Sequence, residues 1–292
     1  MDISSLQAFI AVARHQSFSK ASETLFVTQP AVSKRVASLE EQLGTKLFNR
    51  INRQISLTEA GRKLLPKAQE LVNQAADMQR FATNLNADVN GKLSISISHH
   101  IALYRMPPIL HEFNLRYPKV ELDIQFEDSE QALQAVERGD IEFAVITLPN
   151  QLPDSLQAET AWFDGLDIVV GKDHALANVD TVTLNILAKY SCVLPSVETE
   201  THQIMLREFS AQDLDMNVQM STNNLQSLKM LVVAGVGWSL LPKTMLDDDL
   251  IVLNVNKKLA RVLGVVLHRK RSLSNAAQIM RELLLVNEAL EN

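Results

Sequence analysis

The first side chains in this sequence that could do chemistry are three polar residues at helical spacing, Gln29, Ser33 and Lys34. On a helix they lie opposite a stripe of apolar residues, so all three would face outward. In the major groove of DNA, a glutamine amide can pair with the edge of adenine, and a lysine ammonium can pair with guanine or phosphate. Polar faces of this kind are also simply solvated in many small helical domains, so the spacing alone leaves both interpretations open.

The helix that would position this face has recognisable start and stop signals. Thr28 offers a capping oxygen, Pro30 has the fixed φ favoured in a first helical turn, and Gly44 can end the helix. Apolar residues follow at spacings of four, three and four: Val32, Val36, Leu39 and Leu43. A shorter helix with hydroxyl start signals at Ser17 and Ser19 precedes it. We therefore expect two helices joined by a tight turn.

Longer stretches of the sequence resemble one protein family. The segment ASETLFVTQPAVSKRVASLEEQLGTKLFNR, residues 21–50, followed by LTEAG at residues 57–61, closely resembles the amino-terminal domain of the LysR-type transcriptional regulators. Three later segments resemble the same family: RYPKVEL from Arg116, VERGDIEFAV from Val136 and VVAGVGWSLLP from Val232. The likeness therefore covers essentially the whole chain.

This resemblance implies a winged helix-turn-helix that reads DNA, and it implies roles for individual residues. By position in the motif, the residues facing the major groove would be Gln29, Pro30, Ser33 and Lys34, and those contacting phosphate around the wing would be Arg50 and Arg53. The basic segment at residues 46–53 could instead be a solvated surface turn, although the wing is the favoured interpretation. The implied partner is a double-stranded DNA operator, with RNA polymerase as a further partner to be considered.

A second pattern indicates a helix that pairs with another helix. Apolar residues alternate at spacings of four and three over three heptads: Leu64, Ala68, Leu71, Ala75, Met78, Ala82 and Leu85. Such a seam is typical of coiled-coil pairing, although one amphipathic helix lying on its own domain would show the same spacing. Thr58 supplies the expected cap. The resemblance implies the linker helix of the family, which joins protomers into a homodimer or homotetramer.

The rest of the chain alternates strands and helices. Apolar runs indicate strands at residues 92–98, 120–126 and 141–147, and the segments between them indicate helices at residues 99–116 and 129–138. This order favours a parallel sheet covered by helices on both faces. The same pattern returns after Leu166 and predicts a second α/β lobe.

These features together predict an α/β chain of three parts. They are a winged helix-turn-helix at residues 1–58, a linker and dimerisation helix at 59–90 and an effector-binding domain at 91–292. The resemblance implies that the last part is similar to periplasmic solute-binding proteins, with lobe I at residues 91–160 and 267–292 and lobe II at residues 161–266. The chain would cross between these lobes near residues 149–161 and 262–268.

A small ligand should bind between the lobes, where strand ends and helix starts converge and backbone amides can hold an anion. By resemblance, eight residues are candidate effector contacts: Ser98, His99, Ser129, Thr147, Ser196, Glu198, Thr222 and Asn223. Each could instead be an ordinary helix cap or turn former, because Ser, Thr and Asn cap helices in many proteins. Together they still mark the cleft, and the expected effector is an organic acid or an amino-acid-like metabolite.

Two features near the expected cleft stand out. Asp128 occupies a position where many family members have glycine, and an acid there would disfavour a carboxylate ligand or be turned away from it. His99 and His100 are adjacent, and neighbours at a strand end point in opposite directions, so a shared metal ion is not expected. A pH-sensitive hydrogen bond by one histidine fits better. We expect neither a metal nor a cofactor.

Charge is distributed unevenly along the 292 residues, which carry a net charge of -6. The first 91 residues hold 11 Lys and Arg against 8 Asp and Glu, a net +3, and the remaining 201 hold 17 against 26, a net -9. The basic part is the part with the DNA-reading motif. Because an excess of three charges is small, we expect operator affinity to depend on dimerisation and to fall with salt.

Composition and motifs reduce the number of protein classes to which the chain could belong. Cys192 is the only cysteine, so no internal disulfide is possible and a reducing cytoplasm is expected. The amino terminus does not resemble a signal peptide, and no stretch is long enough to span a bilayer. No catalytic or nucleotide-binding motif argues for an enzyme. Two alternatives to an effector-controlled activator or repressor remain: a redox-responsive regulator using Cys192, and a small-molecule binding protein without DNA function.

Overall fold

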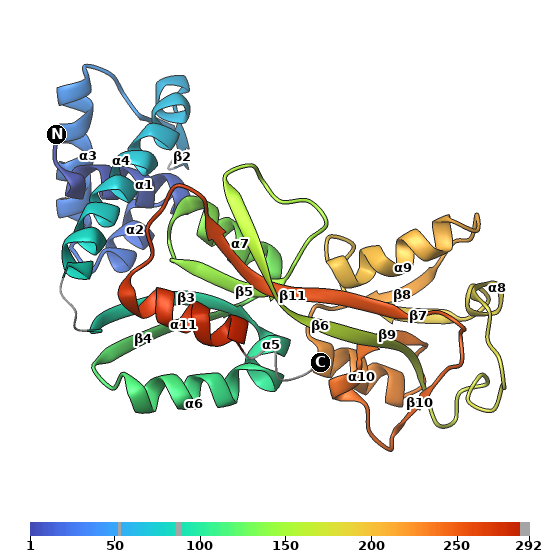
Figure 1. The fold of residues 1–292 in the computed structure, drawn as a ribbon. Helices are drawn as coiled ribbons and strands as arrows, with labels where there is room; N and C mark the ends of the chain where they lie inside the picture. The colour runs from blue at the N-terminus through green and yellow to red at the C-terminus, as the bar shows by residue number, and fades with distance from the viewer. Residues whose placement is uncertain (52–53, 86–88, 287–292) are drawn as a thin grey trace. The chain divides into compact units, whose positions relative to one another are not determined.

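A computed structural model of the chain describes residues 1–51, 54–85 and 89–286 (Figure 1). The chain forms two compact units, Met1–Ala87 and Asp88–Asn292. Within the described ranges, no helix has both the length and the apolar character needed to cross a membrane.

The amino-terminal unit is built from helices and one hairpin. Its elements are α1 (Ile3–His15), α2 (Phe18–Thr24), α3 (Gln29–Leu43), β1 (Phe48–Ile51), β2 (Gln54–Leu57) and α4 (Glu59–Asn84). Ser17 caps α2 through its hydroxyl, which accepts the Lys20 N–H, and Gly44 ends α3 with a φ of 64°. Thr28 precedes α3 as predicted, but its side chain makes no capping hydrogen bond. The predicted pair of helices joined by a short turn is therefore present.

A buried core holds α3 against α1. Val32, Val36 and Leu39 are fully buried, whereas Leu43, which the apolar spacing placed in the same stripe, is exposed at the last turn. Glu40 anchors the segment that follows α3: its carboxylate accepts the Leu47 N–H at 2.9 Å and pairs with the Lys46 ammonium at 2.7 Å. Burial alone would raise the pKa of Glu40, but these hydrogen bonds together hold it below its usual value.

Helix α4 is 26 residues long and uses its apolar stripe in two ways. The Thr58 hydroxyl caps it by accepting the Gly61 N–H at 2.9 Å. In the first turns, Leu64 and the buried Ala68 pack against the core of the amino-terminal unit. Further along, exposed apolar side chains are present on the helix at Leu71, Met78 and Phe81 and directly after it at Leu85. One part of the expected seam therefore packs inside its own unit, and the other part is exposed.

The second unit is organised on a seven-stranded sheet. Its strands are β3 (Gly91–Ser98), β4 (Val120–Glu127), β5 (Phe143–Thr147), β6 (Leu156–Gly171), β9 (Ser239–Pro242), β10 (Leu250–Val252) and β11 (Leu259–His268). The order is β10-β6-β11-β5-β3-β4, with β9 also paired to β6. Strand β3 is parallel to β4 and β5, as the strand and helix order predicted. Strands β7 (Ser191–Leu194) and β8 (Asn217–Ser221) form a separate parallel pair.

Helices cover both faces of the sheet in the first lobe, which is built around β3, β4 and β5. Helices α6 (Met106–Arg116) and α11 (Asn275–Val286) pack on one face, and α7 (Ser129–Arg138) packs on the other. The second lobe has its own core, which includes Phe209 and Trp238. Its helical elements are α8 (Leu184–Leu187), α9 (Glu200–Ser210), α10 (Leu225–Val233) and the short η1 (Lys243–Met245).

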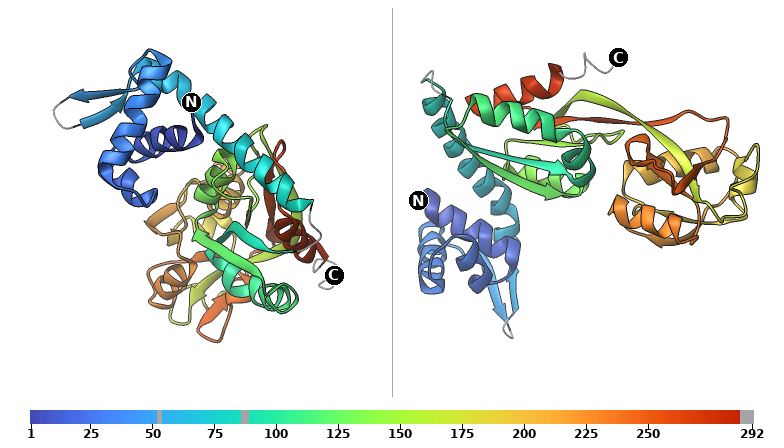
Figure 2. Two further views of the ribbon diagram at one scale, coloured as in Figure 1. Left: turned by 90° about the vertical axis from the view of Figure 1, so that its left-hand side faces the viewer. Right: turned by 90° about the horizontal axis from the view of Figure 1, so that it is seen from below.

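Two long antiparallel strands, β6 and β11, connect the lobes (Figure 1), and Figure 2 shows them in yellow-green and orange-red. Trp162 and Leu263 belong to the first core, whereas Leu166 and Leu259 pack in the second. The change of lobe therefore falls a few residues from the expected crossings, at the place where Asp164 pairs with Arg261 in register.

One helix predicted from the sequence is broken in the structure. The segment expected to form a single helix at residues 99–116 instead contains α5 (His99–Tyr104) and α6, separated at Arg105. The reason is the pair Pro107 and Pro108, which lack backbone N–H donors and fit only the first turn of a new helix. Helix α5 begins at His99, directly after β3. Both histidines thus lie in a helical turn, with His99 exposed and His100 buried.

Candidate functional site

The predicted DNA-reading residues lie together at the start of α3. Gln29 and Pro30 occupy its first turn and are exposed, and Lys34 is exposed one turn later beside the half-buried Ser33. The turn between α2 and α3 passes through Phe26, which has a φ of 53° and a side chain 94% exposed. A positive φ is unusual for a bulky residue, and here it lets the Val27 N–H bond to the Ser22 carbonyl at 3.0 Å.

The two arginines expected at the wing are described only in part. Arg50 belongs to β1, which pairs with β2 as an antiparallel hairpin in the expected wing position. The side chain of Arg50 is not described, and Arg53 lies outside the described residues. Their expected contacts with phosphate therefore stay predictions.

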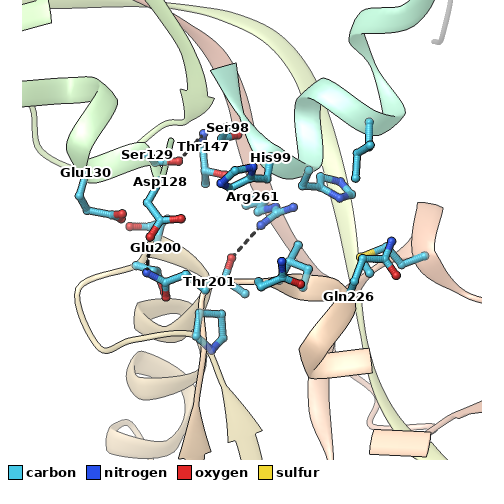
Figure 3. Close-up of a pocket in the computed structure, with 18 of the residues that line it drawn as sticks. Ser98, His99, Asp128, Ser129, Glu130, Thr147, Glu200, Thr201, Gln226 and Arg261 are labelled. Atoms are coloured by element: carbon cyan, nitrogen blue, oxygen red, sulfur yellow. Dashed lines mark hydrogen bonds between the residues drawn. The ribbon is translucent and has the colours of Figure 1, made fainter. Parts of the chain in front are cut away.

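A pocket lies between the two lobes of the second unit (Figure 3). Five of the eight predicted effector contacts line it: Ser98, His99, Ser129, Thr147 and Asn223. The space measures about 730 Å³ when the solvent-open mouth of the pocket is included. The parallel order of β3, β4 and β5 brings the first four residues to one edge, because the carboxyl ends of these strands meet there.

The other three predicted contacts do not line the pocket. The Ser196 N–H donates to the Asn223 amide oxygen at 2.9 Å, so Ser196 orients Asn223 without facing the pocket itself. The Thr222 hydroxyl accepts the Asn224 N–H at 3.3 Å in the turn before α10, as an ordinary turn former does. Glu198 acts at a distance, through its charge on Glu130.

Hydrogen bonds cross the pocket from one lobe to the other. The Asn223 amide donates to the Asp128 carboxylate at 2.8 Å, and the Gln226 amide donates to the Tyr104 hydroxyl at 2.8 Å. Asp128, flagged in the sequence as an unusual acid, is therefore a pocket residue whose carboxylate bridges the lobes. Because these bonds form only when the lobes approach, the described arrangement is a closed one in this respect.

The centre of the pocket holds a buried guanidinium that the sequence analysis missed. Arg261 is only 6% exposed, and its Nε donates to the Asp164 carboxylate at 2.8 Å while its Nη1 donates to the Thr201 hydroxyl at 2.9 Å. Its remaining nitrogen, Nη2, has no hydrogen-bond partner among the described residues. Burial lowers the pKa of Arg261 and Asp164 opposes this change, and a guanidinium keeps its charge in proteins.

His100 lies against the same group. Its Nε2 is 3.6 Å from the Asp164 carboxylate and 3.4 Å from the Thr244 hydroxyl. Burial, together with the positive charges of Arg261 and Arg105, lowers the pKa of His100 to about 3. The imidazole is therefore neutral at physiological pH, so its closeness to Asp164 is not an ion pair.

Carboxylates gather on another part of the pocket. Asp128, Glu130 and Glu200 all line it, and Figure 3 shows the three toward one side of the view. Burial raises the pKa of Glu130, and the charges of Asp128 and Glu198 raise it further, against a hydrogen bond from its own backbone N–H. Glu200 is partly neutralised, because its carboxylate accepts a hydrogen bond from Arg207 at 2.6 Å.

The position of Cys192 disfavours a role as a redox sensor. It is fully buried in β7, and its thiol lies 3.5 Å from the Asn217 carbonyl. Burial raises the pKa of this thiol to about 12, so it stays protonated at physiological pH. Since the thiolate is the reactive form, the geometry argues against the redox alternative.

Comparison with known families decides the identity of the chain. Residues 3–62 match the model of the bacterial regulatory helix-turn-helix protein of the lysR family, and residues 86–287 match the LysR substrate binding domain. The chain belongs to the LysR family. It is a DNA-binding transcriptional regulator with an effector-binding domain, and not an enzyme. This membership also excludes a small-molecule binding protein without DNA function.

Relatives and solved structures support the same LysR assignment. An uncharacterised regulator of Azotobacter vinelandii, encoded in an ibpB-leuC intergenic region, is 56% identical over 108 residues, which are 37% of this chain and 75% of the relative. The uncharacterised regulator YfeR of Shigella flexneri is 26% identical over 279 residues, 94% of this chain and 90% of the relative.

The fold is shared with full-length LysR-type structures. A full-length OxyR from Pseudomonas aeruginosa has a TM-score of 0.69 at 20% identity, over 99% of this chain and 95% of that one. CbnR in complex with its target DNA has a TM-score of 0.64 at 17% identity, over 99% of this chain and 100% of that one. The predicted fold class, a winged helix-turn-helix followed by a long helix and an α/β effector domain, is confirmed.

Proposed function

We propose that this LysR-family regulator binds its operator as a homodimer or homotetramer and that a small molecule in the pocket between the lobes controls this binding. The observation that carries the proposal is the polar pocket bridged by hydrogen bonds from both lobes, Asp128 to Asn223 and Tyr104 to Gln226. A ligand that contacts both lobes favours one arrangement of the lobes over another, and a population shift of this kind can be passed to the DNA-reading units.

The DNA-reading surface of the proposal is the exposed start of α3, with Gln29, Pro30, Ser33 and Lys34 in the major groove and Arg50 and Arg53 on phosphate. The resemblance of CbnR, whose structure was solved with its target DNA, supports this part. Ser33 has no charge to repel the phosphates, so a carboxylate at this position is expected to weaken binding strongly.

A gel-shift measurement tests the DNA-reading surface. Ser33→Glu and Lys34→Glu should each weaken operator affinity by roughly tenfold or more, because each places a negative charge in the groove. Lys119→Glu is the matched control, since Lys119 is exposed in the second unit and the change of charge equals that of Lys34→Glu. Wild-type affinity in both α3 variants would contradict the assignment of these residues.

Operator footprinting tests the control by a ligand. A thermal-shift screen of small metabolites against the full chain identifies compounds that stabilise it, and footprints are then compared with and without a saturating hit. The proposal expects the length or the internal spacing of the protected region to change. Identical footprints with a proven pocket ligand would overturn ligand control while leaving DNA binding intact.

A further inference from the structure

The pocket has two regions of opposite charge. The first, here called the arginine centre, consists of Arg261 and His100, which line the pocket, and of Asp164 and Arg105, which do not line it but form one cluster of charges with Arg261. Asp164 is 1% exposed and lies 2.8 Å from Arg261 Nε and 3.8 Å from Arg105 Nη2. Because His100 is neutral, these four side chains together carry two positive charges and one negative charge. The arginine centre therefore has a net charge of +1.

The arginine centre also has an unused hydrogen-bond donor. Arg261 lines the pocket, and its Nη2 has no partner among the residues that the structure describes. In Figure 3 the Arg261 guanidinium appears between His99 and Thr201 in the pocket. A buried charged donor without a partner is costly. An anionic oxygen bound in the pocket would accept this N–H and would also be attracted by the net charge.

The second region, here called the acidic wall, consists of Asp128, Glu130 and Glu200. Asp128 is bonded to a neutral amide, and Glu200 is paired with Arg207. Glu130 has no ion-pair partner in the described part of the chain, and it is repelled by Asp128 and Glu198. A cation beside Glu130 and Asp128 would relieve this repulsion, and a primary ammonium could donate to both carboxylates.

We propose that the ligand of this pocket is a small zwitterion of the amino-acid type, with its carboxylate on Arg261 and its ammonium on the acidic wall. The proposal rests on the proposed function, in which this pocket is the effector site. A monocarboxylate would satisfy Arg261 but would leave the repulsion around Glu130 unrelieved, and a dicarboxylate would add a further anion beside Asp128 and Glu130. An amine alone would neutralise the wall but would leave the buried Arg261 donor without an acceptor.

Matched probes test the class of ligand. The full chain is screened by thermal shift against the proteinogenic L-amino acids, and the best stabiliser is compared with the same molecule lacking its amine and lacking its carboxylate. For L-leucine these partners are 4-methylpentanoate and 3-methylbutylamine. We expect the amino acid to bind at least about tenfold more tightly than either partner, as measured by calorimetry. No stabilisation by any amino acid, or equal binding of the carboxylate-only partner, would overturn the proposal.

Variants locate the two ends of the ligand. Glu130→Gln keeps the shape of the side chain and should weaken the amino acid about tenfold without weakening the carboxylate-only partner. Arg261→Lys keeps the charge but loses the geometry of the guanidinium, and it should weaken both. Glu121→Gln is the control, because Glu121 is exposed on β4 outside the pocket. Equal loss of both probes in Glu130→Gln would overturn the placement of the ammonium, and thermal melts of each ligand-free variant verify its folding.

Different results would contradict the ligand class and the control of DNA binding by the ligand. If a carboxylate-only compound binds the pocket tightly and changes the operator footprint, the zwitterion is wrong and ligand control of DNA binding stands. If an amino acid binds in the manner expected and the footprint stays the same, the ligand class is right and the pocket does not control DNA binding.

Discussion

At the scale of single residues, the buried His100 makes the stability of the folded chain depend on pH. Its folded-state pKa is lowered to about 3, chiefly by burial, whereas an unfolded histidine titrates near its ordinary value of 6.5. As pH falls below 6.5, the unfolded state therefore binds a proton that the folded state does not bind. His100 then costs up to about 1.4 kcal/mol of stability per pH unit until the pH approaches its folded pKa.

Urea unfolding at pH 7, 5.5 and 4.5 measures this contribution. The free energy of unfolding should fall less steeply toward acid in His100→Gln than in the wild type, because the variant lacks the buried imidazole. Carboxylates titrate in the same window in both proteins, so the difference in slope is the informative quantity. His111→Gln is the control, since His111 is exposed on α6. An unchanged slope in His100→Gln would contradict a buried neutral imidazole.

Cys192 gives a second prediction at this scale. Because its thiol is buried and its pKa is raised to about 12, the native protein should react negligibly with a thiol reagent at pH 7 and fully once it is unfolded. Operator affinity should be unchanged after treatment with peroxide. A footprint that changes with peroxide in the wild type and not in Cys192→Ala would restore the redox alternative.

At the scale of elements, two glycines of the amino-terminal unit are needed for different reasons. A Cβ on Gly61, in the first turn of α4, would lie 2.2 Å from the Leu47 carbonyl oxygen, which is backbone and also accepts the Thr58 N–H. Gly44 has open space around it but a φ of +64°. Gly61→Ala should therefore cost about 1–3 kcal/mol through overpacking, and Gly44→Ala about 1 kcal/mol through backbone strain.

Chemical denaturation of the full chain, followed by a probe in the amino-terminal unit, checks this order. Gly44→Asn is the discriminating control, because asparagine tolerates the left-handed conformation better than alanine. The expected destabilisation is largest for Gly61→Ala, smaller for Gly44→Ala and smallest for Gly44→Asn. A neutral Gly61→Ala would mean that the α3–β1 connection, which contains Leu47, moves easily.

Helix boundaries could be predicted from the sequence where a single residue determines the local backbone conformation. Ser17, Thr58 and Gly44 were read correctly as boundaries because capping and left-handed termination depend on a side chain at a fixed position. The break at Arg105 was missed, although Pro107 and Pro108 signalled it, because the apolar spacing continues across both helices. Strand β6 begins at Leu156, well before Leu166, where the second α/β pattern was predicted to begin, and pairing with β11 holds its first half.

At the scale of the whole molecule, the pocket was predicted better from the first lobe, whose four candidate contacts all line it, than from the second lobe, where only Asn223 does. Residues that follow strands of the first lobe were found, because the carboxyl ends of parallel strands meet at one edge. Arg261 was missed because its partner Asp164 is 97 residues away, and only the register of β6 with β11 brings them together. The available signal was a single charge in the otherwise apolar run LARVLGVVL at residues 259–267.

The pairing of protomers is a property of the whole molecule that can also be predicted from the structure of one chain. Met78, on α4, is 71% exposed and Leu85, directly after the helix, is 73% exposed, and neither belongs to the core that the described residues of this unit form. Exposed apolar residues repeating along one helix are expected to pair with a second copy of that helix. The proposed dimer therefore depends on the second half of α4.

The double variant Met78→Glu/Leu85→Glu tests this dependence by sedimentation. Burying each apolar side chain contributes roughly 1.5–3 kcal/mol, so placing charges at both positions should raise the dissociation constant at least about 100-fold. Gln79→Glu is the matched control, because Gln79 is exposed on the same helix but outside the seam. The operator footprint of the double variant should shrink toward a half-site, since a monomer presents only one α3 to the DNA. A variant that remains dimeric and protects the full operator would show that the protomers are joined elsewhere.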